Sequence, residues 1–148
     1  MGSHYKGSTE EVRSLDTYLK LVRAADSINS KTNLFLSKLN LSESQFLILD
    51  ALYHLGDLAQ KDLAKKLLKS GGNITMVVDN LEARGLVNRI RGKEDRRVFH
   101  VHLTTKGEKE IKNVLPDFVT LITNEMKVLD AVEKKELQRI CKKLGIRN

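Results

Sequence analysis

Basic residues crowd into one short stretch of the sequence, and their side chains carry the clearest chemical capability. Five cations fall within nine residues, namely Arg89, Arg91, Lys93, Arg96 and Arg97. Long cationic side chains at the end of a projecting ribbon bind phosphates or enter a narrow, electronegative minor groove. Asp95 stands two residues before Arg97, where a charge-assisted hydrogen bond would orient the guanidinium. The pattern predicts a polyanion-binding loop with Arg97 as its main contact; the alternative is a solvated charged turn.

The net charge of the chain is distributed in a way that supports a polyanion partner. Residues 58–106 contain 11 Lys and Arg against 5 Asp and Glu, whereas the rest of the chain contains 15 against 14. One third of the chain therefore carries nearly all of the net charge of +7. A phosphate-binding surface requires such clustering, while basic charge that serves solubility does not. Further candidate phosphate contacts in this region are Lys61, Lys65, Lys66, Lys69 and Ser70.

A β-hairpin is predicted to present the charged loop. Leu86–Arg91 and Arg97–Leu103 are rich in residues that favour strands, and they flank the turn-forming segment Gly92–Asp95. In the second segment, alternation predicts an inward and an outward set of side chains. The inward set is Phe99, Val101 and Leu103, and the outward set is Val98, His100 and His102. We therefore expect a two-stranded hairpin with a charged tip.

Two short helices are predicted to precede the hairpin. Leu58–Leu68 is amphipathic, Ser70-Gly71-Gly72 breaks it, and Asn73–Arg84 follows with one apolar face. Such a pair predicts a helix-turn-helix, whose second helix reads base edges in the major groove of DNA. The candidate base contacts are Asn73, Thr75, Met76 and Asn80. Asparagine can pair with adenine and methionine can touch a thymine methyl group, but an ordinary surface helix has the same composition.

Helical arms are predicted on both sides of this region. From Leu15 to Ile28 apolar residues recur every three or four positions, the spacing of a helix that buries one stripe. Capping boxes are expected at Ser42–Gln45, Thr105–Glu108 and Asp130–Glu133. The fold class is therefore mainly α with a small β-hairpin wing. We expect one domain over residues 1–148, with a DNA-binding lobe at 41–107 and arms at 11–40 and 108–148.

Two motifs in the lobe resemble those of a known family. The segment Asp95–Gly107 resembles the wing signature of MarR (multiple antibiotic resistance regulator) proteins, an Asp-x-Arg tip followed by a strand and Leu-Thr-x-x-Gly. Leu81–Arg89 is similar to the exit from that family's recognition helix. The resemblance implies a winged helix-turn-helix with N- and C-terminal dimerisation helices. It also implies a homodimer that binds a palindromic operator in double-stranded DNA, represses transcription, and is released by a small-molecule or oxidative effector.

The same resemblance suggests where an effector would bind and of what class it would be. The N-terminal region and Ser70-Gly71-Gly72 look most similar to the branch that senses quinones and other phenolic electrophiles, which implies a phenolic, quinone-like or other aromatic effector. Candidate pocket residues are Tyr18, Phe46, Tyr53 and His54, although such aromatics often form ordinary core. Cys141 lies on the apolar stripe of the last predicted helix, where it either packs between dimer arms or acts as a redox thiol.

Other functional classes find little support in the sequence. A phosphate-binding glycine loop, a nucleophile elbow and paired carboxylates in apolar surroundings are not evident, so we expect no enzyme. His100 and His102 share a strand face without further ligands nearby, so we expect no metal and no cofactor. No apolar run is long enough to span a membrane, and no secretory leader is evident. We therefore expect a cytoplasmic protein. The remaining rival is an architectural protein that binds DNA without sequence preference.

Overall fold

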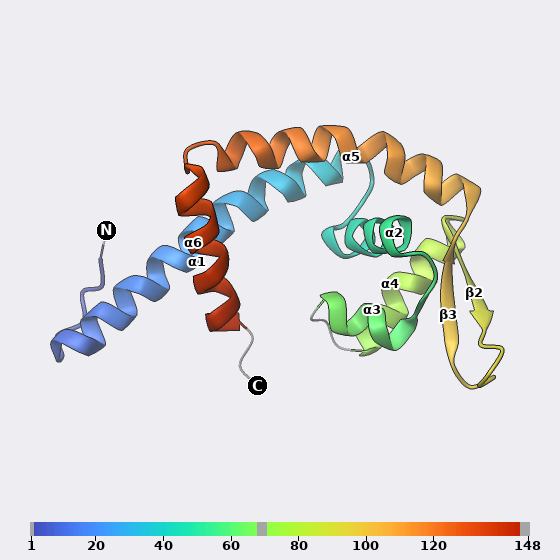
Figure 1. The fold of residues 1–148 in the computed structure, drawn as a ribbon, viewed down its shortest axis with the longest axis horizontal. Coiled ribbons are helices and arrows are strands. Elements are labelled where there is room, and N and C mark those ends of the chain that lie inside the picture. Colours follow the sequence, from blue (N-terminus) through green and yellow to red (C-terminus); the bar gives the residue numbers. More distant parts are fainter. Residues whose placement is uncertain (1, 68–70, 146–148) are drawn as a thin grey trace. The chain divides into compact units, whose positions relative to one another are not determined.

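The computed structural model describes residues 2–67 and 71–145. The elements in chain order are α1 (Thr9–Ser37), α2 (Glu43–Leu55), β1 (Leu58–Ala59), α3 (Gln60–Leu67), α4 (Gly71–Ala83), β2 (Val87–Arg91), β3 (Phe99–Leu103), α5 (Thr105–Met126) and α6 (Ala131–Gly145) (Figure 1). They form two compact units, within residues 1–111 and 112–148. The predicted mainly α fold with a small β wing is confirmed. Among the described residues, no helix has the length and apolar character to cross a bilayer.

Reciprocal capping boxes start α1, α2 and α6. Ser42 and Gln45 form the predicted capping box of α2, with reciprocal hydrogen bonds of 3.1 and 3.0 Å. Asp130 and Glu133 do the same before α6, with both bonds at 2.9 Å. A further box at Ser8 starts α1 at Thr9, earlier than the predicted start near Leu15. The backbone N–H of Ser8 donates to the Glu11 carboxylate, which lowers the pKa of Glu11.

The predicted cap of α5 at Thr105 is wrong by one residue. Thr105 is the first helical residue, and the Oγ1 of Thr104 accepts the hydrogen bond from the backbone N–H of Gly107 at 3.0 Å. The Thr104 hydroxyl also donates to the carbonyl oxygen of Gly85 at 2.7 Å. Thr104 therefore caps α5 and joins it to the turn after α4, and this non-local contact explains why Thr104 is preferred to Thr105.

The sheet has three strands in the order β1-β3-β2, rather than the two predicted. Leu58 and Ala59, assigned from the sequence to a helix, pair antiparallel with Val101 and His100. On the other side of β3, Val101 pairs with Arg89 of β2. The short β1 covers an edge of β3 whose backbone groups would otherwise lack strand partners.

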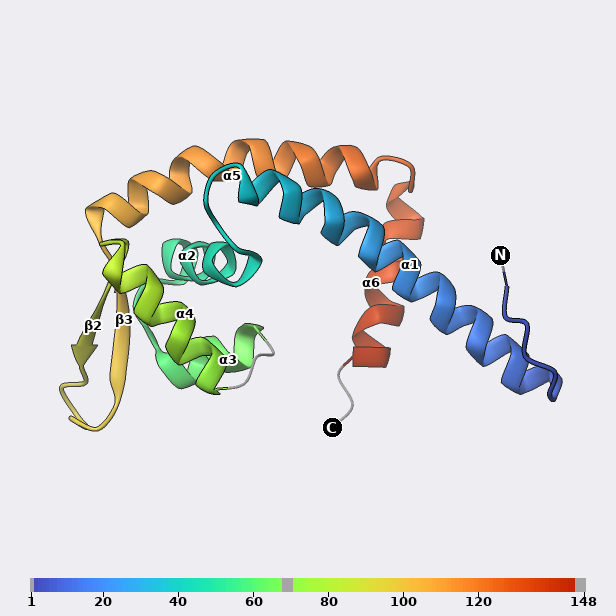
Figure 2. The ribbon, with the colours of Figure 1, turned by 180° about the vertical axis from the view of Figure 1, so that it is seen from behind.

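Helices α2, α3 and α4 pack together and against the sheet (Figures 1 and 2). They bury one continuous set of aliphatic side chains, formed by Ile48, Leu49, Leu63, Ile74, Val78, Leu81, Val87 and Val101. Each such side chain contributes about 1.5–3 kcal/mol when it is removed from water. This core fixes α4 and the wing, the two elements predicted to meet DNA, on one rigid lobe.

Candidate nucleic-acid interface

The two helices of the predicted helix-turn-helix are α3 and α4, which pack against each other. Ile74, Val78 and Leu81 of α4 are fully buried, so they hold one face of this helix against the core. Met76 lies on the opposite face, and 65% of its surface is exposed. An exposed methionine in the first turns of a recognition helix can reach base edges, so Met76 is placed as a base contact requires.

Two other candidates on α4 use their side chains within the protein. The Oγ1 of Thr75 accepts a hydrogen bond from the Nε2 of Gln60 at 2.7 Å. The Oδ1 of Asn80 accepts one from the Nε2 of Gln45 in α2 at 3.1 Å. Asn73 is half-buried near the start of α4. These contacts anchor α4 to α2 and α3, although the side chains of Thr75 and Asn80 remain exposed.

The loop between β2 and β3 carries several cations that are open to a partner. The Arg97 side chain is 93% exposed, and its Nε lies 3.4 Å from the Oδ1 of Asp95. The same carboxylate oxygen accepts from the backbone N–H of Arg97 at 3.0 Å. The predicted contact between Asp95 and Arg97 is therefore present. Lys93 and Arg96 are also exposed in this loop, so several cations reach solvent while Asp95 fixes the backbone.

At the end of the hairpin, Phe99 departs from the predicted alternation. Val101 is fully buried as expected, but Phe99 is 40% exposed rather than inward. Phe99 pairs with Arg91 at the last step of the ladder, and it lines a small hollow with Gln60 and Lys61 at the start of α3. The Arg91 guanidinium lies 5.4 Å from the centre of the Phe99 ring, a cation–π contact that supports this predicted DNA-binding side chain.

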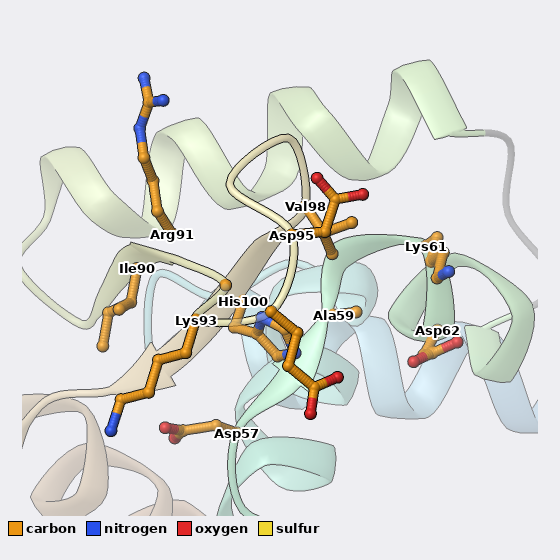
Figure 3. Close-up of a pocket in the computed structure, with 12 residues that line it drawn as sticks. Asp57, Ala59, Lys61, Asp62, Ile90, Arg91, Lys93, Asp95, Val98 and His100 are labelled. Atoms are coloured by element: carbon orange, nitrogen blue, oxygen red, sulfur yellow. The ribbon is translucent and has the colours of Figure 1, made fainter.

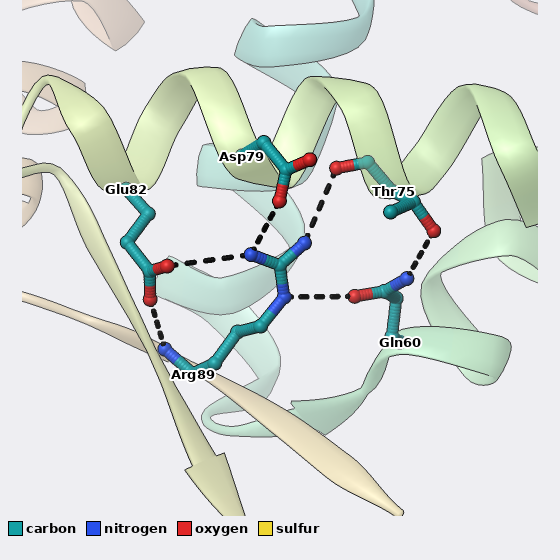
Figure 4. Close-up of polar contacts among 5 residues, drawn as sticks. All are labelled: Gln60, Thr75, Asp79, Glu82 and Arg89. Atoms are coloured by element: carbon teal, nitrogen blue, oxygen red, sulfur yellow. Dashed lines mark hydrogen bonds and ion pairs between the residues drawn. The ribbon is translucent and has the colours of Figure 1, made fainter.

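Arg89 is not at the hairpin tip, where the sequence analysis placed it. It lies in the middle of β2, and its side chain is 17% exposed. The guanidinium faces Asp79 and Glu82 of α4, with its Nη1 at 2.6 and 3.3 Å from their carboxylate oxygens. Figure 4 shows that Gln60 completes this set of polar contacts. The physical reason is the strand's pleat, which turns Arg89 toward α4 and its two carboxylates.

The lysines predicted to bind phosphates lie on α3. Lys61, Lys65 and Lys66 are exposed there, as a backbone-contacting role requires. Lys69 and Ser70 lie outside the described residues. The three described lysines share one short helix before α4, and their contact with phosphates stays a prediction.

A hollow of about 590 Å³ lies between the start of α3 and the wing (Figure 3). Its lining comes from the segments 57–62 and 90–100 and includes Asp57, Lys61, Lys93 and His100. Beside it, the Nδ1 of His102 lies 2.7 Å from the Oδ1 of Asp57. This contact joins β3 to the loop after α2, so the wing is held at its base as well as by the strand ladder.

Comparison with known proteins decides the family. The profile of the MarR family matches residues 41–99, which span α2 to the start of β3. The HTH-type transcriptional regulator MhqR of Bacillus subtilis (strain 168) is 34% identical to this chain over 134 residues, covering 90% of this chain and 92% of MhqR. This chain belongs to the MarR family. It is a DNA-binding transcriptional regulator, and the prediction of a regulator rather than an enzyme is confirmed.

Two solved MarR structures share the fold. One is AbsC, a MarR family transcriptional regulator from Streptomyces coelicolor, with a TM-score of 0.85 and 19% identity over 95% of this chain and 96% of AbsC. The other is a mutant MarR from E. coli complexed with operator DNA, with a TM-score of 0.78 and 25% identity over 94% of this chain and 99% of that one.

The structure gives a physical reason for the glycine in the MarR-like Leu-Thr-x-x-Gly motif. A Cβ atom added at Gly107 would clash with the carbonyl oxygen of Leu86. That carbonyl accepts a hydrogen bond from the backbone N–H of Thr104 at 3.1 Å. Because the first turn of α5 passes so close to the backbone before β2, the position requires a residue without a side chain.

The candidate effector residues do not share one environment. Phe46 is 3% exposed and belongs to the core, which agrees with the alternative that such aromatics form ordinary core. Tyr18 lies on α1 and is 60% exposed. Tyr53 and His54 on α2 contact each other edge to face, with ring centres 5.0 Å apart. Their role in effector binding stays a prediction. Cys141 is exposed on α6 and forms no disulfide.

Sequence reasoning missed the polar residues that hold the recognition helix. Gln60 contacts both Thr75 and Arg89, and Gln45 contacts Asn80. One signal was present in the sequence, because Asp79 and Glu82 are spaced three residues apart on one helix face and precede a basic strand. Such spacing indicates that a nearby cation will be neutralised within the protein.

Proposed function

We propose that this MarR protein binds a palindromic operator as a homodimer in the cytoplasm and represses transcription. The observation that carries the proposal is the pairing, on one rigid lobe, of an exposed recognition-helix face at Met76 with the fully accessible wing cation Arg97. A recognition helix in the major groove and a basic wing near the minor groove contact one half-site from two directions. A bound dimer that overlaps a promoter excludes the polymerase.

The proposed contacts divide into two classes. Met76, with Asn73 and the remaining hydrogen-bonding capacity of Thr75 and Asn80, faces base edges. Phosphates are contacted by the exposed cations of α3 and the wing, which are Lys61, Lys65, Lys66, Arg91, Lys93, Arg96 and Arg97. Lys69 and Ser70 are proposed for this class from the sequence. Phosphate contacts set register and affinity, whereas base contacts set specificity.

The apolar residues of α6 support a homodimer. No residue of α6 is buried within the described chain, although it carries Val132, Leu137, Ile140 and Leu144, all at least partly exposed. Large exposed aliphatic residues at helical spacing mark a protein-binding face. Two lobes held one DNA turn apart, about 34–36 Å, would read the two halves of a palindrome. We propose that a second copy covers this stripe and that Cys141 packs there.

An effector would release the operator. We propose a phenolic or quinone-like compound, in keeping with the resemblance to that branch of the family. Exposed Tyr18 and the pair Tyr53–His54 are the remaining aromatic candidates, since Phe46 is already packed in the core. A panel of phenols and quinones, screened by their effect on operator binding, tests this part separately from DNA recognition.

Selection from a randomised duplex pool tests the proposed function. The full-length protein is mixed with the pool at near-physiological salt, the retained DNA is sequenced, and the oligomeric state is measured in parallel by sedimentation. A palindrome with half-sites about one turn apart supports the proposal. Retention without an enriched motif would instead favour the architectural interpretation, and no retention would point to another acidic partner.

A further inference from the structure

Arg89 differs from the other hairpin cations in how completely the protein uses its guanidinium. An arginine side chain has five N–H donors. The Nη1 of Arg89 contacts Asp79 and Glu82, its Nε donates to the Oε1 of Gln60 at 3.2 Å, and its Nη2 donates to the carbonyl oxygen of Thr75 at 3.2 Å. Three N–H groups thus donate hydrogen bonds to protein acceptors, and the Nη1 also forms an ion pair with Asp79. By contrast, Arg97 keeps 93% of its side chain exposed.

These contacts connect three elements of the lobe. Arg89 lies in β2, Gln60 begins α3, and Thr75, Asp79 and Glu82 lie along α4 (Figure 4). The Glu82 carboxylate also accepts from the backbone N–H of Arg89 at 2.8 Å. Gln60 closes a ring, because its Nε2 donates to the Thr75 hydroxyl while its Oε1 accepts from Arg89. Three successive turns of α4 are therefore fixed against the wing strand through one planar cation.

The local charge argues against Arg89 as a phosphate contact. The two carboxylates around one guanidinium leave this site with a formal charge of −1, which repels a phosphate. Turning Arg89 toward DNA would also leave Asp79 and Glu82 without their counter-charge, and their side chains are 61% and 41% exposed on the helix that enters the groove. These two uncompensated negative charges would repel the phosphates of the DNA that the helix approaches.

We propose that Arg89 is a positioning residue, which sets the orientation of the recognition helix α4 relative to the wing and neutralises its carboxylates without touching DNA. Base contacts require the reading side chains to be held within a fraction of an ångström, so a loosened α4 loses preference for the operator more than general affinity for DNA. The inference rests on the proposed function and specifies how the lobe achieves sequence discrimination.

The test compares full-length variants on two duplexes, the selected operator and a scrambled duplex of equal length and composition, over a series of salt concentrations. Arg89→Gln and Arg89→Lys are expected to weaken operator binding by about tenfold or more, as loss of one or more base contacts does. Binding to the scrambled duplex and the slope of log K against log salt stay as in the wild type. Arg13→Gln, an exposed arginine of α1, is the matched control.

A second variant keeps the test decisive if Arg89 variants unfold. Gln60→Ala removes two hydrogen bonds of the ring without changing charge, and it should also lower the operator preference. The inference is overturned if Arg89→Gln weakens both duplexes equally and reduces the salt slope by about 0.9, the signature of one lost phosphate contact. It is also overturned if Gln60→Ala keeps full preference. A wild type that binds both duplexes equally contradicts the proposed function itself.

Discussion

The carboxylate of Asp95 holds the backbone of Arg97 but leaves its guanidinium in solvent. The Oδ1 of Asp95 accepts from the Arg97 backbone N–H at 3.0 Å and lies 3.4 Å from the Nε. An ion pair this exposed contributes little to folding. Its effect is to restrict the loop conformation from which the side chain extends, so that less entropy is lost when Arg97 docks.

Arg97→Ala is therefore expected to weaken operator binding by about 1–3 kcal/mol. The free energy of unfolding should change by no more than about 0.5 kcal/mol, because 93% of the side chain is exposed. Fluorescence anisotropy on the selected operator measures the first quantity, and urea unfolding measures the second. Arg13→Ala on α1 removes an equivalent charge as a control. Unchanged affinity in Arg97→Ala would remove this residue from the interface.

Met76 is expected to contribute to specificity by contacting a thymine methyl group. Met76→Ala should weaken operator binding by about 1–2 kcal/mol, with the loss confined to one base-pair position. A double-mutant cycle tests the contact by combining Met76→Ala with uracil in place of each thymine in turn, because uracil lacks the methyl group. At the contacted position, uracil should lower affinity for the wild type but not for Met76→Ala. Equal losses for both proteins at every position would show that Met76 does not read thymine.

Ile140 is expected to lie in the dimer interface formed by α6. Ile140→Asp places a charge on the stripe of α6 and should weaken the free energy of dimerisation by about 2 kcal/mol or more. Operator affinity falls with it, because a monomer engages one half-site. Sedimentation measures the assembly state. Gln138→Asp adds the same charge to α6 outside the stripe and should leave the dimer intact; dimers of undiminished stability in Ile140→Asp would contradict the proposed interface.

Phe46 is expected to stabilise the fold rather than bind an effector. Phe46→Ala should lower the free energy of unfolding by about 3–5 kcal/mol, since the ring is 3% exposed in the core. Tyr18→Ala, at 60% exposure, should change it by no more than about 0.5 kcal/mol. Urea unfolding of both variants separates the two cases. If Phe46→Ala is as stable as the wild type, the ring is not a core residue.

Much of the fold could be predicted because its signals are local. Ser42 with Gln45, and Asp130 with Glu133, cap helices through bonds that span three residues, so residue type and spacing suffice. The alternation in β3 placed Val101 correctly for the same reason. The strand at Leu58–Ala59 could not be found, because two residues acquire strand geometry only by pairing with Val101 and His100, far away in the chain.

The same distinction between local signals and contacts of distant segments applies to the candidate site. The sequence by itself determined the helix-turn-helix, the charged wing with its contact between Asp95 and Arg97, and the family motifs, since each depends on residues that are neighbours in the chain. The tertiary structure decided which polar side chains remain available to DNA. Arg89 is bound through Gln60, 29 residues away, and Asn80 through Gln45, 35 residues away. Whether a cation or an amide is free to bind a partner depends on what the fold brings beside it, and that is set by packing between distant segments.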